Sequence, residues 1–184
     1  KYQFSELTLD DKMKQEVLDS ITTFESANST LLPRSGSSIG GHLIYSYLAM
    51  HDANNKEKWL NASMRGVKHA VEYQGDKDTF LMPHHNDMSD AVFMSGPLLA
   101  EIAILNKSGH LEWLCLSHIT NMTRMNLRPD GLHRHSPLDS AAWGRGNGFP
   151  ALGLALSLDA FGIENDKLLR LYKNHIDALM LHQD

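Results

Sequence analysis

The amino-acid sequence predicts an all-α fold built from stacked helical hairpins. Through most of the chain, apolar residues recur every three or four positions, which is the spacing of one face of an α-helix. No segment shows the strict alternation of apolar and polar residues that a half-buried strand requires. Short and long connections alternate between the helical segments, as in helix pairs packed side by side. We therefore expect about seven helices in the 184 residues.

Three helices are expected in the first part of the chain, over residues 8–24, 41–51 and 56–73. Thr8 is placed to cap the first, because its hydroxyl can accept a hydrogen bond from a free backbone N–H group. A loop rich in Ser and Gly is expected at 26–41. The apolar faces of the three helices consist of Met13, Val17, Leu18 and Ile21, then Leu43, Tyr47 and Met50, then Trp59, Met64, Val67 and Val71.

Four more helices are expected over residues 89–105, 109–126, 146–161 and 165–180. Ser89 is predicted to cap the first of these helices. Pro97 should kink or restart the same helix, because proline lacks a backbone donor. Gly162 should end the helix over 146–161. A long polar connection, 128–142, precedes that helix.

The composition excludes several classes of function. The net charge is −5 and the isoelectric point is about 6.1, so the chain has no electrostatic reason to hold a nucleic acid along its surface. No run of ~18 apolar residues is present that could span a membrane. The single cysteine, Cys115, lies in an apolar run and is expected to be buried, and it rules out an internal disulfide and a Cys-rich zinc site.

Neither a linker nor a low-complexity tract is visible, so we expect residues 1–184 to form one domain. Compartment is left open between the cytoplasm and the periplasm or exterior. No targeting segment is visible, and three Asn-X-Ser/Thr sites, at Asn28, Asn61 and Asn121, are weak evidence for secretion. The oligomeric state is equally open.

Ionisable residues gather at 84–90, just before the apolar helix predicted to begin near Ser89. Asp90 falls in the first turn of this helix, where the helix dipole favours an anion. Asp90 could therefore be a functional carboxylate or simply a cap, and Asp87 could cap the helix equally well. His84 and His85 are adjacent loop residues without the spacing of a metal motif, so we expect no metal site.

A second unusual segment spans residues 130–150. Glycine at every second position, from 144 to 148, permits close approach of a ligand to the backbone. The residues between are of types that recognise sugars and carboxylates, namely Trp143, Arg145, Asn147 and Phe149. The alternative is a tightly packed helix start with Arg145 as a surface cation. A nucleotide loop is not expected, because no strand precedes the glycines and no Lys-Ser/Thr pair follows them.

Three short motifs in these segments resemble those of the unsaturated glucuronyl and rhamnogalacturonyl hydrolases, glycoside hydrolase families 88 and 105. They are Asp90-Ala91-Val92-Phe93-Met94 followed by Pro97, Gly131-Leu132-His133-Arg134-His135, and Trp143-Gly144-Arg145-Gly146-Asn147-Gly148-Phe149. Their order and spacing agree with the family over roughly residues 75–160. Phe149 stands where the family usually has tryptophan, and a further family histidine has only His84 or His85 as its candidate.

The resemblance implies an (α/α)6 toroid, of which this single catalytic domain would supply about seven helices as a fragment of a longer chain. It also implies hydration of the C4=C5 double bond in uronyl oligosaccharides left by polysaccharide lyases. Asp90 would be the general acid and base, a role that requires partial burial or apolar neighbours such as Phe93 and Met94. No cofactor is implied. The implied substrate-binding residues are His84, His135, Trp143, Arg145, Asn147 and Phe149.

Two other readings of the same residues remain open. An inverting glycosidase on a similar toroid would need a second carboxyl, for which Asp87 and Asp139 are the candidates. A noncatalytic helical scaffold that only binds carbohydrate would have the same composition. The polysaccharide and the aglycone are not predicted by the sequence.

Overall fold

The computed structural model describes residues 11–28, 36–72 and 87–182, and this part of the chain is all-α, as predicted. Within these ranges there is no named strand, and β-type pairing is limited to two isolated bridges, Leu127 with His133 and Ser136 with Asp139. Seven of the described α-helices have nine or more residues, which matches the expected number. The chain divides into two compact units, residues 1–32 and 33–184, which are described separately. This division leaves the expectation of one catalytic domain untested.

The first unit contains helix α2, Asp11–Asn28. Its four predicted core residues, Met13, Val17, Leu18 and Ile21, are all partly buried, whereas the neighbouring polar positions 15, 16, 19 and 20 are exposed. The 3–4 spacing of apolar residues therefore marks the less exposed face of this helix correctly. The predicted cap, Thr8, lies outside the described residues.

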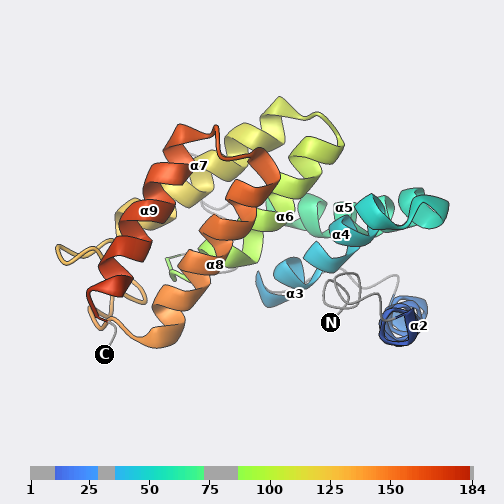
Figure 1. Cartoon of the computed structure of the whole chain (residues 1–184), viewed down its shortest axis with the longest axis horizontal. Helices are drawn as coiled ribbons and strands as arrows, with labels where there is room; N and C mark the ends of the chain where they lie inside the picture. Colours follow the sequence, from blue (N-terminus) through green and yellow to red (C-terminus); the bar gives the residue numbers. More distant parts are fainter. Residues whose placement is uncertain (1–10, 29–35, 73–86, 183–184) are drawn as a thin grey trace. The chain divides into compact units, whose positions relative to one another are not determined.

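The second unit contains the remaining helices. They are α3 (Gly36–Gly41), α4 (Leu43–His51), the 3-10 turn η1 (Ala53–Asn55), α5 (Lys56–Glu72), α6 (Ala91–Leu105), α7 (Gly109–Asn126), α8 (Gly144–Phe161) and α9 (Asp166–Met180). Helix α6 is the central element, since it contacts α3, α4, α5, α7 and α8 (Figure 1). Eleven of its fifteen residues are buried, so it is apolar on all sides rather than amphipathic.

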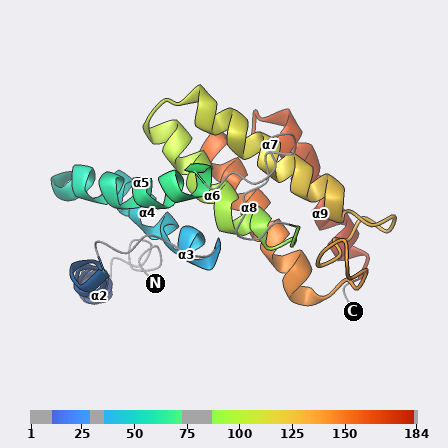
Figure 2. The ribbon, with the colours of Figure 1, turned by 180° about the vertical axis from the view of Figure 1, so that it is seen from behind.

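The helices after residue 90 form two consecutive hairpins. Helix α7 runs antiparallel to α6, because His118 Nε2 lies 2.9 Å from the Ala91 carbonyl oxygen while the Cys115 thiol donates to the Gly96 carbonyl at 3.2 Å. Helix α9 packs against α8, and α6 and α8 also pack together (Figure 2). This is the predicted arrangement of stacked hairpins, and closure into a toroid stays a prediction. Cys115 is fully buried, as expected.

Glycines allow α6 and α8 to approach each other closely, and the two helices run in the same direction. A Cβ atom on Gly153 would lie 2.7 Å from the backbone of Val92 and Phe93, and one on Gly96 would lie 3.2 Å from the Ser157 hydroxyl. Residue 153 thus lies beside 92–93, and residue 157 beside 96, so the two helices are parallel. Because they are parallel, their N-terminal ends lie at the same end of the pair.

Three expectations about local structure are wrong. The apolar face expected for α4 includes Met50, which is 41% exposed, whereas Tyr45, Leu48 and Ala49 are the apolar residues that are buried. Residues 36–41, expected within a loop, form helix α3, where Ile39 is fully buried and Gly40 packs against Met94. Ser89 does not cap α6, which begins at Ala91 without a side-chain cap. By contrast, Asn165 caps α9 by accepting a hydrogen bond from the Leu168 N–H at 3.2 Å. The helix predicted over 146–161 begins at Gly144 and ends before Gly162, as expected.

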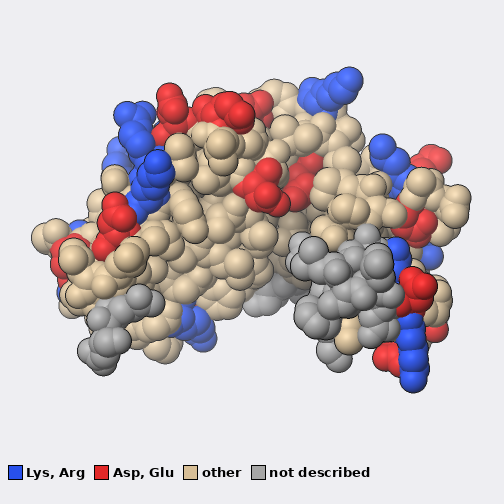
Figure 3. Space-filling view, viewed as in Figure 1, with Lys and Arg blue, Asp and Glu red and all other residues tan. Residues whose placement is uncertain are grey.

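Among the described residues of the second unit, the basic side chains on the face shown in Figure 3 form separate groups and no continuous stripe. Among the described residues, no helix is both long and apolar enough to cross a bilayer.

Candidate functional site

Three segments meet at the N-terminal ends of α6 and α8. They are residues 87–90 before α6, the connection 127–143, and the first turn of α8. Ser89 joins all three: its backbone N–H donates to the His135 carbonyl at 2.8 Å, and its hydroxyl donates to the Gly146 carbonyl at 2.8 Å. Ser89 is fully buried. The two motif regions singled out in the sequence are thus held together by direct hydrogen bonds.

Asp90 lies at the centre of this meeting point. Its carboxyl Oδ2 lies 3.6 Å from the Arg145 Nε, and its Oδ1 lies 3.9 Å from the His135 Nδ1. Asp90 is only 5% exposed, yet its side chain makes no capping hydrogen bond to α6. The reading of Asp90 as a simple helix cap is therefore wrong. The carboxyl faces a cation and an imidazole, and among the described residues its Oδ1 has no hydrogen-bond partner.

Arg145 and His135 are positioned by the indole ring of Trp143. The Arg145 guanidinium carbon lies 4.7 Å from the centroid of the indole, a cation–π distance. The His135 ring meets the same indole edge-on, with centroids 5.1 Å apart. The Arg145 side chain remains 54% exposed, so its guanidinium is available to a ligand from solvent. Trp143 is also partly exposed, at 44%.

An aromatic pair lies one turn further along the two helices. Phe93 and Phe149 stack with ring centroids 5.3 Å apart and planes inclined by 26°. Phe93 follows Asp90 by three residues and Phe149 follows Arg145 by four, which is one helical turn in each case. Both rings are partly buried, and they provide apolar surface beside the Asp90–Arg145 pair.

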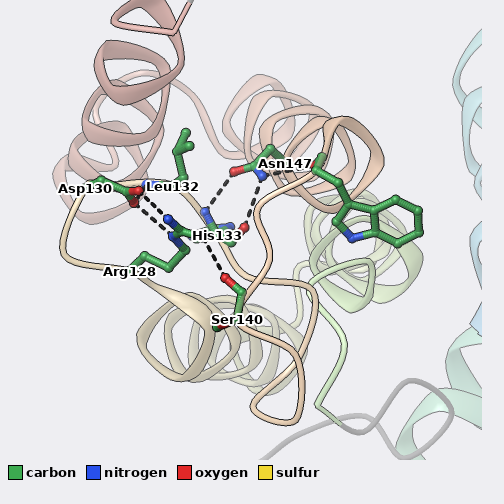
Figure 4. Close-up of polar contacts among 7 residues, drawn as sticks. Arg128, Asp130, Leu132, His133, Ser140 and Asn147 are labelled. Atoms are coloured by element: carbon green, nitrogen blue, oxygen red, sulfur yellow. Dashed lines mark hydrogen bonds and ion pairs between the residues drawn. The ribbon is translucent and has the colours of Figure 1, made fainter.

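Asn147, predicted to bind substrate, instead holds the backbone of the 127–143 connection. Its side-chain oxygen accepts from the His133 N–H at 2.8 Å, and its amide nitrogen donates to the carbonyls of His133 (3.0 Å) and Trp143 (3.1 Å) (Figure 4). Asn147 is buried, and both of its amide protons are used by these bonds. We therefore correct its expected role from contacting a sugar to shaping the loop.

Arg128 closes the base of the same connection. Its guanidinium forms a two-point contact with Asp130, at 3.2 and 2.7 Å, and donates to the Ser140 carbonyl at 2.6 Å (Figure 4). The hydrogen bonds from Arg128 hold the pKa of the Asp130 carboxyl below its usual range. The Asp130 carboxylate also accepts from the Leu132 N–H at 3.1 Å. These contacts tie the two ends of the connection that carries His135.

The two histidines of the Gly-Leu-x-x-His region point to different environments. His135 faces Asp90, whereas His133 is fully buried and stacks on His175 of α9, with centroids 4.4 Å apart. Burial, and secondarily the charge of His175, lower the pKa of His133 to about 3, so its ring is neutral at physiological pH. His175 Nε2 in turn lies 3.0 Å from the Asn147 carbonyl. His133, His175 and Asn147 thus form one buried support beneath the start of α8.

The remaining predicted residues divide into those that lie elsewhere and those that are not described. His84 and His85 lie outside the described residues. The Asp139 carboxylate accepts from the Ala141 N–H at 2.9 Å and stabilises its own exposed turn. In the described part of the chain, no group of three or more metal-ligating side chains converges.

Sequence reasoning missed the role of Ser89 as a connector. The only local signal was a serine at a predicted helix start, and a serine in that position predicts an N-cap rather than a link between two helices. Its partner, Gly146, lies 57 positions away. We found no protein-family model, no curated protein and no solved structure that matches this chain. The resemblance to the unsaturated uronyl hydrolases therefore rests on the three sequence motifs alone.

Proposed function

We propose that this protein is a glycoside hydrolase that acts on unsaturated uronyl oligosaccharides by hydrating their C4=C5 double bond. The observation that carries this proposal is the buried Asp90 carboxyl lying 3.6 Å from the half-exposed Arg145 guanidinium. The reaction needs a proton donor beside a group that binds a carboxylate, and a carboxyl next to a guanidinium has the side-chain chemistry for these two roles. The two residues come from motifs on separate helices. The proposed reaction requires their side chains to lie close together.

In the proposed reaction, Asp90 donates its proton to C4, and the electrons of the double bond form the new C–H bond. The positive charge at C5 is shared with the ring oxygen. Water then adds to C5 and gives a proton back to the Asp90 carboxylate. The resulting hemiketal opens and releases the aglycone alcohol.

Arg145 is proposed to bind the carboxylate of the uronic acid. Its guanidinium has five N–H donors in a planar fork, and its exposure leaves them open to a ligand. His135 is proposed to position the attacking water or a sugar hydroxyl, since its ring also faces Asp90. Phe149, with Phe93 stacked on it, is proposed to cover an apolar sugar face.

The test is loss of the ultraviolet absorbance of an unsaturated uronyl disaccharide. We expect the wild type to remove this absorbance and Asp90→Asn to lower the rate by at least 100-fold, on the order expected for losing a general acid. Asp177→Asn is the matched control, because Asp177 is an exposed carboxylate on α9. A saturated sugar released without any loss of absorbance would instead indicate an inverting glycosidase, and binding without turnover would indicate a noncatalytic scaffold.

The inverting mechanism needs a second carboxyl roughly 6.5–9.5 Å from the first. Of the two candidates, Asp139 already has a structural hydrogen bond within its turn. Asp139→Asn should therefore retain turnover of the unsaturated disaccharide. Release of a saturated sugar without loss of absorbance, dependent on Asp139 as strongly as on Asp90, would favour the inverting reading.

A further inference from the structure

Pro150 leaves a backbone carbonyl of α8 without its usual partner. In a regular helix, the carbonyl of residue 146 accepts a hydrogen bond from the N–H of residue 150. Residue 150 is a proline inside α8, so this N–H does not exist. Gly146 is buried, and a buried carbonyl without a partner is destabilising. Another donor has to be provided at this point.

Ser89 is that donor. Its hydroxyl donates to the Gly146 carbonyl at 2.8 Å, and both residues are buried. Ser89 directly precedes Asp90, and Gly146 directly follows Arg145. The hydrogen bond therefore joins the two chain segments one residue away from the Asp90–Arg145 contact on each side. It links the start of α6 to the first turn of α8.

We propose that Ser89 is a positioning residue that fixes the separation between the Asp90 carboxyl and the Arg145 guanidinium. It does so through its hydrogen bond to the backbone carbonyl that Pro150 leaves without a partner in α8. This inference deepens the proposed hydrolase function and rests on it. Ser89 does not reach the reacting atoms, because it is fully buried beneath them. It acts by setting the separation between the proton donor and the group that binds the uronate.

The variant Ser89→Ala isolates this contact. It removes the bond to Gly146 but keeps the backbone bond from the Ser89 N–H to the His135 carbonyl, so the loop that carries His135 stays tied. Arg145 keeps its guanidinium and still binds a carboxylate, so KM should change by less than about twofold. The Asp90 carboxyl should then be displaced relative to the bound substrate. A displacement of about 1 Å is enough to slow the chemical step severely, so kcat should fall tenfold or more.

A second substitution separates the effect of Ser89 on the position of Asp90 from its effect on the stability of the fold. Pro150→Ala restores an N–H that can donate to the Gly146 carbonyl within α8. Ser89→Ala should lower Tm by roughly 2–8 °C in the wild type, and by clearly less in the P150A background. The loss of kcat should persist in the S89A/P150A double variant, because the bond within α8 does not connect α8 to α6.

Ser63→Ala is the matched control. Ser63 is also fully buried and its hydroxyl donates at 2.8 Å, but to Leu60 within α5. It should lower Tm without lowering kcat. If Ser89→Ala keeps kcat within twofold of the wild type, or if Pro150→Ala restores kcat together with Tm, the positioning role is refuted.

Crystal structures of the wild type and of Ser89→Ala test the same role without any substrate. We expect the separation of Asp90 Oδ2 from Arg145 Nε to exceed 3.6 Å in the variant. An unchanged separation overturns the inference, whatever the activity. A wild type that leaves unsaturated disaccharides intact overturns the proposed function instead, and a separation that widens in that case still supports Ser89 as the residue that sets the register.

Discussion

The buried ring of His133 makes the stability of the fold sensitive to acid. Its folded-state pKa is about 3, against a usual value of 6.5, because burial disfavours the charged ring. The unfolded chain therefore takes up a proton below about pH 6.5, whereas the folded chain does so only near pH 3. The stabilising effect of the neutral ring is complete above pH 6.5 and is lost as the pH falls toward 3.

The size of this effect follows from the two pKa values. At pH 5 the His133 ring is protonated in the unfolded state, because this pH lies 1.5 units below the usual pKa of 6.5, whereas the ring stays neutral in the folded state. Protonation therefore favours the unfolded state by about 2 kcal/mol, at 1.36 kcal/mol per pH unit. His133→Phe keeps a ring that can stack on His175 but removes the proton-binding group. Both ring nitrogens of His133 have no hydrogen-bond partner among the described residues, so this change breaks no such bond.

Urea unfolding of the wild type and His133→Phe at pH 8, 7, 6 and 5 measures the difference. Between pH 8 and pH 5 the variant should lose about 2 kcal/mol less of its free energy of unfolding than the wild type. His110→Phe is the control, because His110 is exposed and also lies against an aromatic ring, that of Trp113. It should follow the wild type. Parallel pH profiles for the wild type and His133→Phe would refute the reasoning.

Three further outcomes are expected. Arg145→Lys should lower kcat/KM about tenfold or more despite the conserved charge, because lysine lacks the planar fork and the stacking on indole; equal kinetics would exclude a two-point contact. Burial, and secondarily the charge of Asp159, raises the pKa of the Glu101 carboxyl to about 7. The stability that depends on protonated Glu101 is therefore present below pH 4.5 and lost as the pH rises through 7. Glu101→Gln should therefore be more stable than the wild type by about 1–2 kcal/mol at pH 8, allowing for partial exposure, and similar to it at pH 4.5; a difference independent of pH would contradict this origin. Gly153→Ala should lower the free energy of unfolding by about 1–3 kcal/mol, because its Cβ would lie 2.7 Å from the α6 backbone. Gly148→Ala, with no atom within 4 Å of the added Cβ, should instead be neutral or stabilising, as measured by urea unfolding.

The helices of this protein were predictable because helical periodicity is a local property. Apolar residues at 3–4 spacing place the core faces of α2 and α5 without reference to the rest of the chain. Asn165 was expected near the start of α9, and its side chain forms a cap there. Helix α3 was missed because its Ser- and Gly-rich sequence has low helix propensity, which is overridden where Ile39 is buried and Gly40 packs on Met94.

The candidate site was predictable in its residue types but only partly in its roles. Asp90, His135, Trp143 and Arg145 were singled out from the sequence, and the structure brings them together. Asn147 was assigned to a ligand because asparagine both donates and accepts hydrogen bonds. Those same properties serve the backbone of the loop equally well, and only the folded chain shows which partner the side chain meets.

By itself, the sequence determined that the protein is helical, where most of its helices begin and end, and which ionisable and aromatic residues are candidates for chemistry. The tertiary structure alone decided that Ser89 connects two helices rather than capping one, and that His133 is buried while His135 faces the carboxyl. The physical reason is distance along the chain. Helix formation depends on neighbours within four residues, whereas a hydrogen-bond partner or a charge at the site is contributed by a segment more than forty residues away.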